Sequence, residues 1–325
     1  MMSHHLPPTL ALLLPLALLS CGGSDGGTSG VGGSGGNPAA SDGSSGATDA
    51  GRAGGSNGME SGGTSNGSGG TSNGSGGSGP IASSGCGISA PATPPGTVDV
   101  GGTTRTFIVD VPVGYAPGVP TPILFGFHGM STSGELFRSQ FYGNLLSAFG
   151  DDFIVVHPNA EGDPTAWATS GGDDVLFFDA LLALLAATYC IDETRVFVTG
   201  HSSGGFFTNT LGCQRGEVLR GVGPVSGGGP FTFGGSTCTG QVAAWIAHGN
   251  NDETVDFSNG ESSRDHWAAA NGCDTSQSTV PSPNYPCVEY VGCDPSYPVR
   301  WCEYDDGHDW ASFAPEAMHD FFSGL

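Results

Sequence analysis

The sequence predicts an α/β fold: an open, mostly parallel central sheet with helices on both of its faces. After residue 97, stretches typical of strands alternate with stretches typical of helices, as they do in parallel sheets joined by crossover helices. Ile123–Phe127 is almost entirely apolar, as expected for a parallel strand that is covered on both faces. A third observation is local: Arg195–Thr199 reads as a strand and leads through a glycine-rich turn into the helix-like stretch Phe206–Cys213.

The individual elements follow from the same patterns. A hairpin is expected where alternating apolar residues flank Gly101-Gly102. A helix is expected from Asp173, because the acidic pair Asp173 and Asp174 suits the positive end of the helix dipole. The expected strands cover residues 98–100, 105–111, 123–127, 153–156, 195–199, 222–225, 242–247, 288–291 and 299–304. The expected helices cover residues 134–148, 173–189, 206–213, 261–270 and 315–322.

The chain divides into three parts. Residues 1–21 read as a signal peptide whose apolar run is too short to span a bilayer. Its end, Leu18-Leu19-Ser20-Cys21, resembles a bacterial lipobox, although no Lys or Arg precedes the apolar run. We therefore expect a lipid anchor on Cys21 and a location outside the cell or on its surface, with ordinary secretion as the alternative.

The second part, residues 22–84, is built almost entirely from small and polar residues, and Gly-Gly-Thr-Ser-Asn-Gly-Ser occurs there twice in tandem. Such a segment cannot bury enough apolar surface to offset its chain entropy, so a disordered tether is expected. The third part, residues 85–325, has the length of a single α/β domain.

Cysteine count and charge limit the possible classes of function. Eight cysteines remain in the predicted domain, and an even number behind a signal peptide favours disulfides in an oxidising compartment. No C-x-x-C pair or His-rich cluster supports zinc, so neither a metal nor a cofactor is expected. The net charge of −23, without any lysine, argues against nucleic acids and anionic membrane surfaces as partners. A neutral polymer or ester suits this charge, and solubility also explains it.

The segment Gly200-His201-Ser202-Ser203-Gly204 matches the G-x-S-x-G nucleophile elbow in its expected setting of strand, tight turn and helix. Gly200 and Gly204 lack the Cβ atoms that would collide in so tight a turn. The alternative is an ordinary glycine-rich loop, because the chain holds 58 glycines. The elbow reading makes Ser202 the nucleophile of a hydrolase.

A serine hydroxyl needs a histidine base that is held in the right tautomer by a carboxylate. In α/β-hydrolases these residues follow successive strands in the chain order Ser, Asp, His. Ser202, Asp252 and His308 have this order, and each follows an expected strand end. They are therefore the predicted catalytic triad.

Other histidines and carboxylates compete for these roles. His201 would point away from the hydroxyl of its neighbour, and Glu253 and Asp256 are the alternatives to Asp252. His128, His157 and His248 end strands and are expected to bond to backbone. His266 and His319 fall on expected helices and read as surface or packing residues.

The developing oxyanion requires two backbone N–H donors. Ser203 follows the nucleophile directly, and Met130 follows the strand 123–127, with Gly129 and Ser131 as alternatives. Trp167 lies in a loop at the carboxyl edge of the sheet, where its ring could stack on a phenolic substrate. Packing in the core is the alternative for Trp167.

Eight stretches carry a family resemblance: residues 84–87, 124–128, 167–175, 198–205, 248–252, 271–273, 292–293 and 298–301. Over residues 86–325 the chain resembles the secreted feruloyl esterases of types C and D. These belong to the esterase and polyhydroxybutyrate-depolymerase group of α/β-hydrolases, in carbohydrate esterase family 1. The stretch Trp167–Val175 and the Gly292-Cys293 and Pro298-Val299 motifs are more particular to these esterases than the elbow is.

The resemblance implies hydrolysis of feruloyl (hydroxycinnamoyl) esters on plant cell-wall polysaccharide, with Ser202, Asp252 and His308 as the triad. We expect a monomer that acts on esterified polysaccharide or on small aromatic esters. Met130 replaces a bulkier residue that is common in the family, which puts the acyl specificity in doubt. Polyhydroxybutyrate depolymerase and acetylxylan esterase are alternatives with the same triad. An inactive, glycan-binding surface lipoprotein is an alternative of another class.

The disulfide pairing is expected partly from the same resemblance, because eight cysteines alone permit 105 connectivities. The resemblance carries Cys213–Cys238 and Cys273–Cys293, each of which brackets an excursion of the chain. Cys287 and Cys302 are additions to the family pattern and lie on two short neighbouring strands, where a cross-strand bridge is possible. Cys86–Cys190 remains by elimination.

Overall fold

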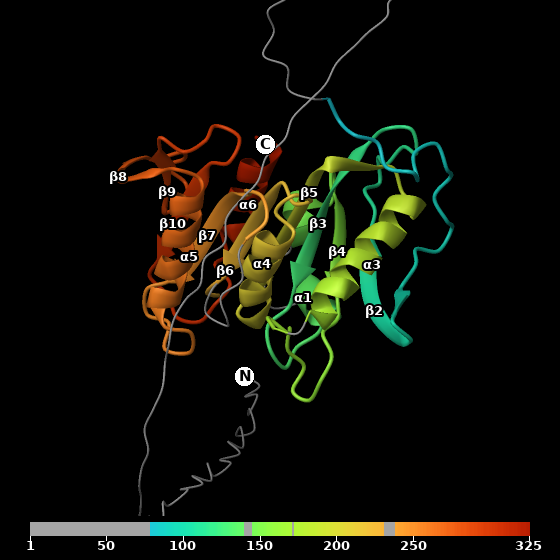
Figure 1. Ribbon diagram of the computed structural model, residues 1–325, viewed down its shortest axis with the longest axis horizontal. Helices are drawn as coiled ribbons and strands as arrows, with labels where there is room; N and C mark the ends of the chain where they lie inside the picture. Colours follow the sequence, from blue (N-terminus) through green and yellow to red (C-terminus); the bar gives the residue numbers. More distant parts are fainter. Residues whose placement is uncertain (1–78, 140–144, 171, 231–237) are drawn as a thin grey trace, which may run out of the picture. The chain divides into compact units, whose positions relative to one another are not determined.

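The computed structural model describes residues 79–139, 145–170, 172–230 and 238–325 (Figure 1). The predicted signal peptide, Cys21 and the tether up to residue 78 lie outside these ranges. Within them, no helix combines the length and the apolarity needed to cross a membrane.

In the described residues, ten strands form one sheet in the order β1-β2-β4-β3-β5-β6-β7-β10-β9-β8. The strands are β1 Thr97–Val100, β2 Thr103–Asp110, β3 Thr121–Phe127, β4 Ile154–Pro158, β5 Ile191–His201, β6 Gly221–Val225, β7 Ala243–Gly249, β8 Asp274–Thr279, β9 Cys287–Val291 and β10 Val299–Tyr304. The helices are α1 Gly134–Ser139, α2 Leu145–Phe149, α3 Asp173–Thr188, α4 Ser203–Gln214, α5 Phe257–Ala270 and α6 Ala314–Ser323.

The middle of the sheet is parallel. Strands β4, β3, β5, β6, β7 and β10 all run in one direction, and β3 pairs with β4 on one side and with β5 on the other. Antiparallel strands close both ends, with β1 and β2 beyond β4 and with β9 and β8 beyond β10. The carboxyl ends of β5, β7 and β10 therefore meet at the same edge of the sheet, which is where ligands bind in open α/β sheets.

Helices cover both faces of the sheet, as the sequence predicts. Side chains of β3 alternate between two cores: Phe125 packs with the residues of α3, α4 and α5, whereas Leu124 packs with those of α1, α2 and α6. Figure 1 shows α3, α4 and α5 in front of the sheet and α6 behind it. This double coverage explains why the parallel strands are uniformly apolar rather than alternating.

Several elements differ from the expectation. Strand β8 was not predicted, because all six of its residues are exposed and its polar sequence carries no alternation; it is a strand only through its pairing with β9. Helix α5 begins at Phe257, earlier than expected, because the Asp256 side chain accepts a hydrogen bond from Ser258 N and caps it. The expected helix 134–148 consists of α1 and α2, with residues 140–144 outside the described ranges.

The amino-terminal end of the domain is tied to β5. Ser83 N donates to Ile191 O, and Ala82 forms an isolated antiparallel β-bridge with Asp192. Residues 81–84, which were expected in the tether, thus pair with the domain, so the folded part begins a few residues earlier than predicted. Four disulfides join the described cysteines, and they are the four predicted pairs: Cys86–Cys190, Cys213–Cys238, Cys273–Cys293 and Cys287–Cys302.

Candidate active site

Ser202 lies in the tight turn between β5 and α4. Its backbone has φ 55° and ψ −118°, a conformation that L-residues rarely adopt, and its N–H donates to Val225 O at 3.0 Å. A side chain at Gly204 would collide with the backbone carbonyl of Phe127 on β3, and one at Gly200 would collide with Gly204. Helix α4 can therefore approach β3 closely only because these two positions are glycine.

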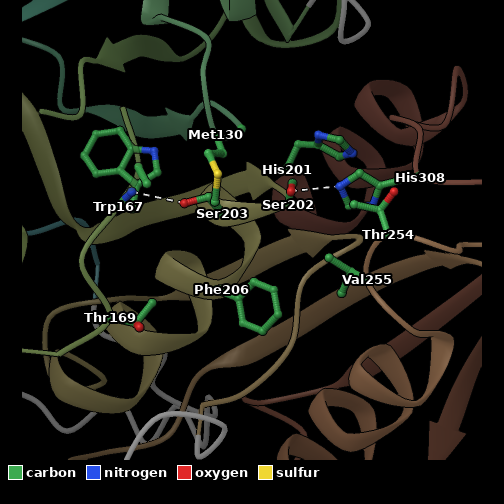
Figure 2. Close-up of a pocket in the computed structure, with 12 residues that line it drawn as sticks. Met130, Trp167, Thr169, His201, Ser202, Ser203, Phe206, Thr254, Val255 and His308 are labelled. Atoms are coloured by element: carbon green, nitrogen blue, oxygen red, sulfur yellow. Dashed lines mark hydrogen bonds between the residues drawn. The ribbon is translucent and has the colours of Figure 1, made fainter. Parts of the chain in front are cut away.

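Three loops bring the predicted catalytic side chains together at the carboxyl edge of the sheet. His308 Nε2 lies 2.8 Å from Ser202 Oγ, and His308 Nδ1 lies 2.7 Å from Asp252 Oδ2. Figure 2 shows His308 beside Ser202, with its ring directed at the hydroxyl. The parallel pairing of β7 with β10 positions the Asp252 and His308 loops next to each other. The result is one continuous hydrogen-bond chain from hydroxyl to imidazole to carboxylate.

The surroundings of Asp252 favour its ionised form. Burial opposes ionisation, but hydrogen bonds from His308 and from the N–H groups of Val255 and Thr254 outweigh it and lower the pKa of this carboxyl. Both N–H groups donate to Oδ1 at 2.9 Å, which leaves Oδ2 for the histidine. A carboxylate held this way keeps the imidazole in the tautomer with its proton on Nδ1, so that Nε2 can accept the hydroxyl proton.

The two carboxylates that competed with Asp252 do not contact the predicted base. Asp256 caps α5, and the side chain of Glu253 is exposed. Among the described residues, the carboxylate within hydrogen-bond distance of His308 is that of Asp252.

The competing histidines divide into three groups. His201 is buried with its ring centroid 4.9 Å from that of His308, and burial together with the nearby His308 lowers the pKa of His201 to about 3. His128 and His248 bond to backbone as expected: His128 Nε2 accepts from Ala160 N at 3.0 Å, and His248 Nε2 lies 2.9 Å from Val255 O. His266 and His319 lie on α5 and α6, as expected.

His157 corrects one prediction. Neither of its ring nitrogens has a hydrogen-bond partner among the described residues, so it does not bond to backbone. The ring is fully buried beside Phe137, and burial lowers its pKa to about 4. It is a neutral packing residue.

A pocket of about 460 Å³ opens beside Ser202. Figure 2 shows the side chains around it, which come from the end of β5, from the start of α4 and from the loops after β3, β4, β7 and β10. Both predicted oxyanion residues, Met130 and Ser203, line it, and so does the alternative Gly129. The Met130 side chain is 54 % exposed and lies at the pocket surface. Ser203 begins α4, so its N–H is one of the unpaired donors at a helix amino terminus.

Trp167 lies beside this pocket, but its ring is a packing element. The indole is only 4 % exposed and stacks on Phe207, with centroids 5.1 Å apart and an interplanar angle of 11°. Its Nε1–H donates to His128 O at 2.9 Å, and its backbone N–H donates to Ser203 Oγ at 3.0 Å. This packing fits the alternative named for Trp167, although the residue also belongs to the lining of the pocket, so its contact with substrate stays a prediction.

Sequence reasoning missed five residues of the pocket lining: Ala166, Thr169, Phe206, Thr254 and Val255. Phe206 is one helical turn after Ser202, and its N–H donates to Ser202 O at 3.0 Å, so its partly exposed ring faces the same space as the nucleophile. The spacing of four residues on the predicted helix is a signal that could have identified it. Thr254 and Val255 follow Asp252 directly in the turn that wraps its carboxylate, and no pattern in the sequence marks them.

Among the residues that the structure describes, no group of three His, Cys, Asp or Glu side chains is placed to hold a metal ion.

The sheet order, the helices on both faces and the nucleophile turn define an α/β-hydrolase fold, and the comparisons with known proteins agree. The acetyl xylan esterase of Aspergillus awamori superposes with a TM-score of 0.53 at 17 % identity, covering 68 % of this chain and 94 % of that one. No family model matches the chain. The class is that of carboxylic ester hydrolases.

The particular family follows from sequence. Feruloyl esterase C of Emericella nidulans is 31 % identical over 256 residues, which cover 74 % of this chain and 90 % of that protein. Feruloyl esterase D of Neurospora crassa is 30 % identical over 268 residues, with the same two coverages. The chain belongs to the feruloyl esterase C and D family, as its motifs indicate.

Proposed function

We propose that this protein is a serine carboxylesterase in which Ser202 is the nucleophile, His308 the general base and Asp252 the residue that orients the base. The observation that carries the proposal is the unbroken chain of hydrogen bonds from Ser202 Oγ through His308 to Asp252, at 2.8 and 2.7 Å. These distances are within the range required for proton transfer from the hydroxyl to the imidazole.

The proposed reaction has two halves. Ser202 Oγ attacks the ester carbonyl while its proton passes to His308 Nε2, and the N–H groups of Ser203 and Met130 stabilise the oxyanion. Collapse of the tetrahedral intermediate expels the alcohol, which takes the proton from His308, and leaves an acyl-enzyme. Water, activated by His308 in the same way, then releases the acid. Ionised Asp252 stabilises the imidazolium that forms in each half.

We propose feruloyl-type esters of plant cell-wall polysaccharide as the substrates. The relatives named above are feruloyl esterases, and the pocket volume is within the range of small-molecule sites. Phe206, Met130 and Val255 provide apolar walls that suit an aromatic acyl group. The complete hydrogen-bonded triad argues against the alternative of an inactive glycan-binding protein.

We also propose that the protein acts outside the cytoplasm. Its four disulfides are compatible with an oxidising compartment. Lipidation of Cys21 is a separate proposal that rests on the lipobox-like sequence. Labelling with a radioactive fatty acid should mark the wild-type protein and not Cys21→Ser.

The decisive test is Ser202→Ala, assayed on methyl ferulate, p-nitrophenyl acetate and polyhydroxybutyrate. Ester hydrolysis should fall by about 10⁴-fold or more, because the residues of a triad act as a unit. Ser203→Ala is the matched control: it keeps the backbone N–H and loses only the hydrogen bond from Trp167 N. More than a tenth of the wild-type rate in Ser202→Ala would rule out the mechanism, and a preference for acetate or for the polyester would redirect the substrate assignment.

A further inference from the structure

A second histidine contacts the carboxylate of the proposed triad. His248 lies on β7, four residues before Asp252, and is fully buried. Its Nε2 lies 3.2 Å from Asp252 Oδ2 and 2.9 Å from Val255 O. Oδ2 is the same oxygen that His308 contacts at 2.7 Å. His248 therefore contacts the carboxylate of the proposed triad, although it is not among the residues that line the pocket.

The contacts of the His248 ring define its protonation. Nε2 faces two acceptors, so it carries a proton that it shares between the carbonyl and the carboxylate. Nδ1 has no hydrogen-bond partner among the described residues, and Gly260 of α5 packs so closely against it that a side chain there would displace the ring. Burial lowers the pKa of His248, which favours the uncharged form of the ring. The ring is thus a neutral imidazole with its only proton on Nε2.

We propose that His248 is a positioning residue, which holds the Asp252 carboxylate and the Val255 turn in place through its single Nε2–H. The proposal rests on the function proposed above and extends it. Asp252 receives four donors in this arrangement: the N–H groups of Thr254 and Val255 on Oδ1, and His308 and His248 on Oδ2. Val255 also lines the pocket, so the Nε2–H of His248 contacts both the triad carboxylate and a residue of the pocket wall.

The donor number of Asp252 has a consequence for the pH dependence of the reaction. A carboxylate that loses one donor attracts the remaining protons more strongly, including the proton on a neighbouring imidazolium. The titratable groups that act on His248 are Asp252 and His308 in the triad, His201 on β5 and Asp256 at the start of α5. The ring of Phe257 packs edge-on at 5.8 Å. Removal of the His248 donor should therefore make the base protonate more readily and shift the acidic limb of the rate profile to higher pH.

The test compares His248→Leu, which removes the donor, with His248→Gln, whose amide N–H can replace it. On p-nitrophenyl acetate, His248→Leu should lower kcat about tenfold, because one hydrogen bond to a charged group is lost. The acidic limb of the kcat/KM profile should move up by about half a pH unit. His248→Gln should restore most of both values. His157→Leu makes the same substitution at another buried strand-end histidine and should change neither.

Several outcomes would overturn the proposal. An unchanged acidic limb in a folded His248→Leu protein would do so, and so would a His248→Gln protein no better than His248→Leu. If His248→Leu does not fold, Gly260→Ala serves instead, because it displaces the ring without removing the donor and is judged by the same pH profile. Ser202→Ala separates the two proposals: if it stays active the serine mechanism fails, whereas if it is inactive and His248→Leu is normal, only the role of His248 fails.

Discussion

The two sides of the Ser202–His308 hydrogen bond are held in different ways. The serine side is a turn in which backbone packs against backbone: Gly204 lies against the carbonyl of Phe127, and the Ser202 N–H is bonded to Val225. The histidine side is a loop whose residues 305–309 are exposed or half-buried. It is held by hydrogen bonds between loops, such as Asn251 N to Asp306 O at 3.0 Å and the Tyr304 hydroxyl to Asp309 O at 2.6 Å. One close backbone approach adds to them, because Gly249 lies against the Gly307 carbonyl.

This difference indicates that the nucleophile and the base of one site are positioned by different kinds of contact. The position of the nucleophile follows from local sterics, which allow almost no variation without a clash. The position of the base depends on several contacts between exposed or half-buried loops, of which the approach of Gly249 to Gly307 is the tightest, and on the Cys287–Cys302 bridge between β9 and β10. Damage to the serine side should thus be severe and abrupt, and damage to the histidine side graded.

The largest effect is expected from Gly204→Ala. The new Cβ would collide with the Phe127 carbonyl, so β3 and α4 must separate. We expect a loss of about 3 kcal/mol in the free energy of unfolding, and a fall in kcat of about a hundredfold because Ser202 is displaced. Urea unfolding and steady-state kinetics measure both. Gly114→Ala, where a Cβ would meet nothing within 4 Å, is the control. Equal behaviour of the two variants would contradict this account of the turn.

Acid should weaken the serine side through His201. The unfolded residue binds a proton near pH 6.5, whereas burial and the nearby His308 hold its pKa in the folded state at about 3. The unfolded state thus binds more protons between these values, and stability that is complete above pH 6.5 is lost as the pH falls. The loss should reach about 3 kcal/mol by pH 4.

Urea unfolding at pH 7, 5.5 and 4.5 checks this loss. His201→Asn should flatten the dependence only in part, because burial also lowers the pKa of His157, to about 4. Stability that stays constant over this range in the wild-type protein would be incompatible with neutral buried histidines.

Loss of the Cys287–Cys302 bridge should lower the free energy of unfolding less than the changes above. It should affect the position of His308 more than that of Ser202. Cys287→Ser with Cys302→Ser should cost about 2 to 3 kcal/mol, because a 15-residue loop is no longer closed. Activity should be lost on heating before the protein unfolds globally, since β10 leads directly into the His308 loop. The matched double variant at Cys213 and Cys238 removes a bridge next to α4 and should lose activity only together with its fold. Activity and circular dichroism are followed on one temperature ramp, and coincident losses in both variants would refute the distinction.

The smallest effect is expected from Tyr304→Phe. Its buried hydroxyl donates to the carbonyl of Asp309, next to His308, and contacts Ser226 Oγ at 3.2 Å. Loss of this bond should cost about 1 kcal/mol and lower kcat by about three- to fivefold. Tyr115→Phe is the control: its hydroxyl accepts from Cys190 N, just before the start of β5, whereas Ser202 follows the other end of that strand. This variant should lose similar stability without a change in kcat. A Tyr304→Phe protein with wild-type kcat would show that the loop does not depend on this bond.

The sequence by itself determined the features that depend on local rules. Apolar runs such as Ile123–Phe127 predict buried parallel strands, because coverage on both faces leaves no polar side. The glycines around Ser202 predict the turn, since only that spacing relieves its clashes. Chain order and strand ends favour Asp252 and His308 over their competitors, and these two side chains lie 2.7 Å apart in the structure.

Only the tertiary structure decided which side chains lie in contact. The register of β7 against β10 brings the Asp252 turn to His308, while His248 on β7 contacts the same carboxylate, and nothing in the sequence specifies that register. Polar β8 is a strand only because β9 offers an edge with unpaired backbone groups. Trp167, for which the sequence left substrate contact and core packing open, lines the pocket with a ring that is buried against Phe207, while the Phe206 ring is partly exposed there. The physical reason is that periodicity encodes which face of an element is buried, whereas proximity between loops arises from how the whole sheet is assembled.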